Sequence, residues 1–108
     1  MTGRKSRKNA RVDCAISGRV LGSRGYHKGT VHNLSTGGLF FAGRNLAVGA
    51  RTELEFRLEG TEIHATCEVL YRQSVGDGAG IGVRFLRINA AAVERIRKYL
   101  AAGAPSDA

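Results

Sequence analysis

Two short groups of residues have the types and spacing that could bind a phosphorylated, hydrogen-bonding ligand. The first is Arg7 and Arg11, two arginines four positions apart near the N-terminus. A guanidinium can hold a phosphate, or two neighbouring acceptors on a base edge, through paired hydrogen bonds, and it can also stack on a purine. A chain with 13 arginines in 108 residues contains about one such pair by chance. The spacing alone is therefore weak evidence.

The second group runs from Asn33 to Gly38 in the order Asn-x-Ser-x-x-Gly, with Ser35 at its centre. With Asn or Asp allowed at the first position, this composition would give roughly 0.05 copies of the pattern by chance, so it is the more specific of the two. Asn, Ser and Gly are also the usual residues of turns. The pattern therefore predicts either an ordinary turn or a turn that carries a binding site.

Candidates for catalysis are few. The three histidines, His27, His32 and His64, are scattered and lack metal-ligand spacing. Cys14 and Cys67 are too few for a disulfide framework and fall among alternating apolar residues, which favours buried, inert thiols. The sequence contains neither a nucleophile elbow nor a Gly-rich phosphate loop. We therefore expect no enzymatic activity, no metal and no cofactor.

Length and composition indicate one globular domain. The 108 residues suit a single domain, and 43% hydrophobic residues exclude a disordered chain. The longest apolar run, residues 39–42, is far short of the roughly 18 needed to span a bilayer, and no apolar stretch follows the basic N-terminus. These features predict a soluble, cytoplasmic protein without membrane insertion.

Positive charge is concentrated at the start of the chain. The formal net charge is +8, and five Lys or Arg residues precede the first acidic residue, Asp13. Residues 1–11 are thus predicted to form a mobile basic arm. Its partner could be nucleic acid, an anionic membrane surface or a phosphorylated small ligand, or the arm could be only a solvated tail.

From Val12 onward the apolar residues alternate, as they do in strands with one buried face. Glycine-rich turns divide this part into six strands, predicted near residues 12–20, 26–34, 39–42, 52–58, 63–71 and 81–85, with residues 76–80 as a loop. In the fifth strand the alternation assigns Tyr71 to the core. A helical stripe follows over about 89–101, with Asn89 as N-cap and Gly103 as the stop.

Six short strands closed by one helix predict an antiparallel barrel or sandwich spanning residues 12–103, followed by a tail over 104–108. The helix is expected to cover the core of its own barrel with its apolar stripe.

Together, and in this order, the two motifs resemble the PilZ domain family, receptors for the bacterial second messenger cyclic di-GMP. The resemblance extends from about Arg4 to Leu100 and includes the stretch from Gly80 to Phe85 before the helix. It implies a mostly β fold, a six-stranded antiparallel PilZ-type barrel with a C-terminal helix. It also implies that the ligand binds between the N-terminal arm and the barrel surface.

The resemblance assigns a role to each motif residue. Arg7 and Arg11 would hold phosphate and guanine, Asn33 would face a guanine edge in place of the family's more usual Asp, Ser35 would offer a hydroxyl, and Gly38 would let the backbone approach the ligand. Additional contacts are expected from Arg4, Lys8 and Gly37. Ligand binding would order the arm, and an unidentified protein partner would then recognise the changed surface.

Two other functions are compatible with parts of the sequence. One is a small basic barrel that binds single-stranded nucleic acid. Aromatic residues are only 6% of the chain. Phe56, Phe85 and Tyr71 fall on the same face of their strands as the predicted core residues, which argues against an exposed stacking surface. The other is a PilZ-type interaction module in motility or pilus assembly that needs no ligand. Such modules usually lack one of the two motifs, whereas this chain has both.

Overall fold

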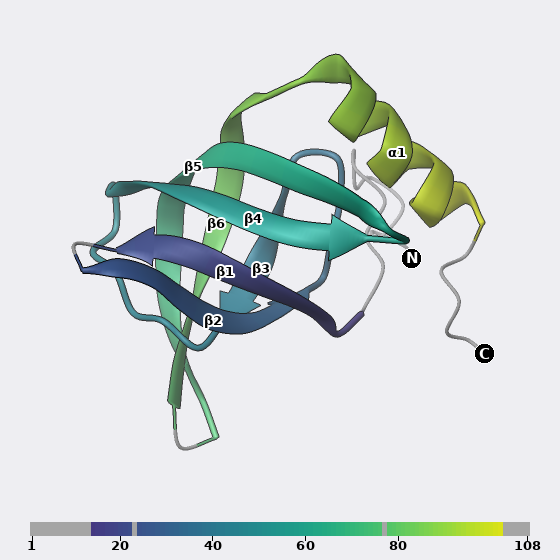
Figure 1. Ribbon diagram of the computed structural model, residues 1–108. Coiled ribbons are helices and arrows are strands. Elements are labelled where there is room, and N and C mark those ends of the chain that lie inside the picture. Colours follow the sequence, from purple (N-terminus) through teal and green to yellow (C-terminus); the bar gives the residue numbers. More distant parts are fainter. Residues whose placement is uncertain (1–13, 23, 77, 103–108) are drawn as a thin grey trace, which may run out of the picture.

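Six antiparallel strands close into a barrel, and one helix lies across one of its ends (Figure 1). The computed structural model describes residues 14–22, 24–76 and 78–102. Around the barrel the strands follow the order β1-β2-β3-β6-β5-β4. The elements are β1 Ile16–Gly22, β2 Gly25–His32, β3 Gly38–Ala42, β4 Arg51–Leu58, β5 Thr61–Val75, β6 Gly78–Ile88 and α1 Ala90–Ala101. The predicted barrel with a C-terminal helix is confirmed.

The core follows from the alternation of apolar and polar residues. In β4, Leu54, Phe56 and Leu58 are buried, while the charged residues that alternate with them face outward. Cys67 lies in the same core, where burial raises the pKa of its thiol to about 12. The predicted core position of Cys67 is confirmed, and a thiol with so high a pKa stays protonated at neutral pH. Cys14 is half-buried, and its thiol donates a hydrogen bond to the carbonyl of Val31.

Helix α1 begins at the predicted cap. The side-chain oxygen of Asn89 accepts a hydrogen bond of 2.8 Å from the backbone N–H of Ala92, which satisfies one of the free donors of the first turn. Ala92, Ile96 and Tyr99 are buried in the common core. The helix thus covers the core of its own barrel, as expected, whereas its predicted stop, Gly103, lies outside the described residues.

The hairpin formed by β5 and β6 is longer than predicted. Residues 78–80, expected in a loop, continue β6, with Ala79 opposite Ser74 and Gly80 opposite Gln73. Backbone pairing builds this part without alternating apolar side chains, so the sequence pattern gave no sign of it. The extended hairpin projects beyond the rest of the barrel (Figure 1).

A β-bulge in β5 overturns the predicted position of Tyr71. Val69 pairs with Val83 and Tyr71 with Gly82, so Leu70 is an extra residue without a partner of its own. An extra residue reverses the alternation beyond it. Tyr71 consequently lies on the outer surface, 46% exposed, rather than in the core.

Candidate functional site

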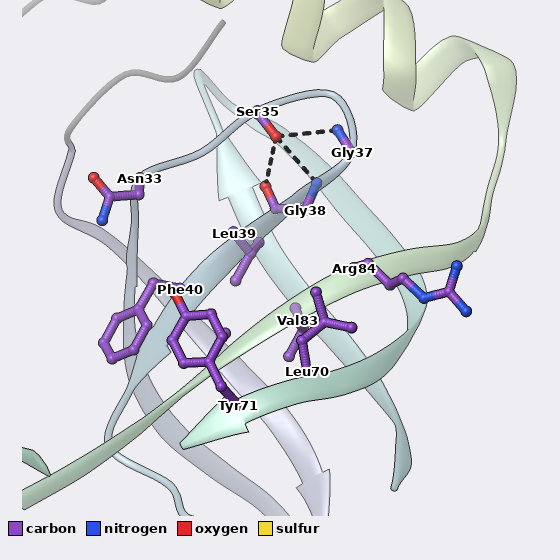
Figure 2. Close-up of a pocket in the computed structure, with 11 residues that line it drawn as sticks. Asn33, Ser35, Gly37, Gly38, Leu39, Phe40, Leu70, Tyr71, Val83 and Arg84 are labelled. Carbon is purple, nitrogen blue, oxygen red and sulfur yellow. Dashed lines mark hydrogen bonds between the residues drawn. The ribbon is translucent and has the colours of Figure 1, made fainter. Parts of the chain in front are cut away.

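Ser35 organises the turn between β2 and β3. Its Oγ accepts hydrogen bonds from the backbone N–H groups of Gly37 and Gly38, at 3.1 and 3.2 Å, and donates one of 3.2 Å to the carbonyl of Gly38 (Figure 2). A hydroxyl has one hydrogen and two lone pairs, so these bonds use its full capacity. Ser35 is also buried. Its observed role is therefore to hold the turn, and a ligand contact to its hydroxyl would require one of these bonds to be exchanged.

Gly38 is required by the packing of β3 against β6. The two strands pair here, with Gly38 opposite Arg84. A Cβ added to Gly38 would collide with the backbone carbonyl oxygen of Val83. The need for glycine at this position thus arises within the barrel, a different reason from the close ligand approach that the sequence suggested.

The Gly38→Ala substitution should therefore destabilise the barrel itself. A methyl group forced against strand backbone typically costs about 1–3 kcal/mol, and urea unfolding would measure the loss. Thr36→Ala is the control, because it changes the same turn and leaves the bonds of Ser35 in place; we expect a change below about 0.5 kcal/mol. Equal losses in the two variants would contradict the steric explanation.

Asn33 lies immediately after β2 in a left-handed backbone conformation, with φ of 50°. Asn is among the few residues other than glycine that adopt this conformation readily. Its side chain is exposed and points away from Ser35 (Figure 2). Asn33 thus has a backbone role in turning the chain, and its amide is available at the rim of the pocket described below.

Two aromatic rings form a flat surface across three strands. Phe40 on β3 and Tyr71 on β5 are both paired with Gly82 on β6, which lies between them. Their rings are stacked, with centroids 6.3 Å apart and an interplanar angle of 23°. The ring of Tyr71 lies over Gly82 so closely that a Cβ there would collide with it. Phe40 is buried beneath this arrangement, and Tyr71 presents its ring to solvent.

The turn and the aromatic pair border one pocket of about 230 Å³ (Figure 2). Arg84 also lines it, but its guanidinium points away from the pocket and is held by Glu68 through contacts of 2.6 and 2.7 Å. The remaining lining residues are Leu39, Leu70, Gly82 and Val83. The described wall therefore offers polar atoms and an aromatic ring but no cation without a partner.

The structure brings together one of the two predicted groups. Asn33, Ser35, Gly37 and Gly38 all line the pocket. Arg7 and Arg11, with the additional candidates Arg4 and Lys8, lie outside the described residues.

Tyr71 is the pocket residue that sequence reasoning missed. The alternation of apolar residues in β5 predicted that the Tyr71 side chain faces the core, and the bulge at Leu70 turns it outward. An available signal in the sequence was Gly82, because a glycine between apolar strand residues leaves room for a neighbouring side chain to lie over the strand.

The pocket combines a few polar groups of a turn with an aromatic and aliphatic lining, the mixture of surfaces that small-ligand sites use. Among the residues with described positions, no group of three or more His, Cys, Asp or Glu could hold a metal ion. Within the same part of the chain, no helix has the length and apolar character to cross a membrane.

The PilZ domain model matches residues 5–102, and the chain belongs to the PilZ domain family. Solved structures of PilZ proteins share its fold. The Bacillus subtilis inhibitor of motility MotI superposes with a TM-score of 0.81 at 18% identity, over 90% of this chain and 50% of that one. The PilZ domain of Escherichia coli YcgR with c-di-GMP gives 0.71 at 14% identity, over 89% of both chains.

A third neighbour is the PilZ domain of CeSA from a cellulose-synthesizing bacterium, with a TM-score of 0.60 at 20% identity over 87% of this chain and 96% of that one. At these identities the likeness establishes the fold. The chain spans half the length of MotI. No curated protein matches it significantly.

Proposed function

We propose that this domain is a receptor for cyclic di-GMP, which binds between the pocket and the basic arm. The observation that carries the proposal is the position of the exposed Tyr71 ring beside the Asn-x-Ser-x-x-Gly turn in one pocket. Membership of the PilZ family supports it. So do the structures of Escherichia coli YcgR and of its PilZ domain, which were solved with c-di-GMP.

The chemistry of the pocket suits one guanine. An aromatic ring open to solvent can stack on a base, and Tyr71 provides one. Asn33 at the rim offers an amide oxygen, which accepts from the N1–H or exocyclic amine of guanine, and an amide N–H₂, which donates. Ser35 contributes indirectly, because its three hydrogen bonds fix the backbone of the turn that borders the base.

The phosphates require cations from outside the described wall of the pocket, where Arg84 is already paired with Glu68. We assign that role to Arg7 and Arg11, whose guanidinium groups can bind phosphate through two parallel hydrogen bonds. Neutralising the charge of the arm would hold it against the barrel and change the exposed surface. A partner protein would then recognise the ligand-bound surface.

Calorimetric titration of the purified chain with cyclic di-GMP tests the proposal. GTP and a short single-stranded oligonucleotide are the controls. We expect saturable binding of cyclic di-GMP at micromolar concentration or tighter, and none of GTP. The absence of heat with cyclic di-GMP would favour the ligand-independent interaction module. Binding of the oligonucleotide alone would favour the nucleic-acid barrel.

A further inference from the structure

The ion pairs of the barrel leave a surplus of cations on its surface. Five of the six glutamates in the described part of the chain contact a basic side chain within 4.0 Å, in the pairs Glu53–His64, Glu55–Arg19, Glu62–Arg57, Glu68–Arg84 and Glu94–Arg97. Glu59 is the remaining one. The unpaired charge of the described surface is therefore almost entirely positive, independently of the N-terminal arm.

Four of the surplus arginines lie at the end of the barrel opposite α1. Because the strands are antiparallel, β1, β3 and β5 all end here, and β2, β4 and β6 all begin here. Arg24 lies between β1 and β2, the half-buried Arg44 follows β3, Arg51 begins β4, and Arg72 lies in β5 opposite Ile81, just before the projecting part of the hairpin. Within the described residues, none of the four has a carboxylate partner. We call this end of the barrel the arginine end.

Exposed apolar side chains lie at the same end. Val48, in the connection that leads into β4, is 62% exposed, and Leu21, near the end of β1, is 38% exposed. The hydroxyl of Thr52 donates to the carbonyl of Leu21, which places Leu21 beside the start of β4. Aliphatic side chains surrounded by arginines suit the boundary between lipid headgroups and acyl chains, where anionic phosphates and apolar surface meet.

We infer that the arginine end docks on an anionic lipid surface. The arginines would contact headgroup phosphates, and Val48 and Leu21 would face the acyl boundary. Nucleic acid fits this end less well, because Tyr26, the exposed aromatic residue at the start of β2, is engaged: its hydroxyl donates to Glu55, and the Arg19 guanidinium lies 4.6 Å from its ring centroid. The inference rests on surface charge and exposure and does not depend on the cyclic di-GMP proposal.

Vesicle co-sedimentation tests the docking surface directly. The full chain would be mixed with vesicles of phosphatidylcholine that contain about one third phosphatidylglycerol, and with pure phosphatidylcholine vesicles. The test variant is R24Q/R51Q/R72Q. The matched control is R87Q/R95Q/K98Q, which removes three exposed cations near α1 and leaves the net charge and the arm the same as in the test variant.

Each arginine near an anionic surface contributes about a fivefold increase in binding. We therefore expect the test variant to lose roughly a hundredfold in partitioning onto the anionic vesicles, and the control variant less than about fivefold. Val48→Ser, which keeps every charge, should lose a fewfold more than Leu86→Ser, whose exposed leucine lies toward the helix end.

Three results would overturn the inference. The first is an equal loss in the two triple variants, and the second is failure of the unchanged chain to bind anionic vesicles. The third is that R24Q/R51Q/R72Q weakens binding to a DNA duplex and not binding to the vesicles. Circular dichroism would show that the variants are folded. Cyclic di-GMP titration of an R24Q/R51Q variant separates the two proposals, because neither arginine lines the pocket and its affinity should be unchanged.

Discussion

Replacing either Arg7 or Arg11 with alanine is expected to weaken cyclic di-GMP binding at least tenfold while the barrel stays folded. The ligand carries two negative charges, and the described wall of the pocket has no free cation, because Arg84 is bound to Glu68. A hydrogen bond to a charged group is worth about 1.5–3 kcal/mol, which corresponds to roughly ten- to a hundredfold in affinity. Calorimetric titration of each variant measures the loss.

Two further substitutions in the same arm separate charge from geometry. Lys5→Ala removes one positive charge outside the Arg-x-x-x-Arg motif, and we expect a loss of less than about threefold. Arg7→Lys keeps the charge but not the planar fork, so its affinity should lie between those of the unchanged chain and Arg7→Ala. Unchanged affinity in both alanine variants would mean that the arginine pair is not part of the site.

Removal of the Tyr71 ring is the second change with a large expected effect. Stacking of a base on an aromatic side chain contributes about 1–3 kcal/mol, so Tyr71→Ala should lose roughly five- to a hundredfold in affinity for cyclic di-GMP. Tyr71→Phe keeps the ring and should bind nearly as well as the unchanged chain. Thermal unfolding should change little in Tyr71→Phe, whereas Tyr71→Ala uncovers Phe40 and should lower the unfolding temperature modestly without unfolding the barrel.

Gly82→Ala tests the same surface without removing an aromatic group. The new Cβ would collide with the ring of Tyr71, a side chain that can swing away. We expect reduced affinity, because the displaced ring no longer lies flat beside the turn. If Tyr71→Ala and Gly82→Ala both bind cyclic di-GMP normally, the guanine stacks elsewhere and the pocket assignment fails.

The fold could be predicted from the sequence wherever apolar residues alternate or repeat at helical spacing. Leu54, Phe56 and Leu58 are buried in β4 as their alternation required, and Asn89 caps α1 through its side chain. Both results depend only on local sequence and on one buried face. The motif turn was likewise located correctly at residues 33–38, because its residue types are specific.

The remainder depends on contacts between distant segments. Position 38 requires glycine because a Cβ there would collide with the backbone carbonyl of Val83, and the Ser35 hydroxyl is used up by hydrogen bonds within its own turn. Neither fact can be read from the residue types alone. The pairing that extends the β5–β6 hairpin involves Gly80, which has no side chain to show a pattern. The position of Tyr71 was predicted wrongly for the same reason, since the bulge arises from pairing between strands.

The bulge at Leu70 makes the exposure of the aromatic surface depend on the register of two strands rather than on side-chain chemistry. If Leu70 itself paired opposite Gly82, regular alternation from Val69 would turn the Tyr71 ring toward the barrel interior with every side chain unchanged. Deleting Leu70, by contrast, would remove the bulge and leave Tyr71 opposite Gly82 on the outer face. The outward position of the ring is therefore a property of its pairing with Gly82, and a shift of β5 by one residue against β6 would remove the binding surface without any change of sequence.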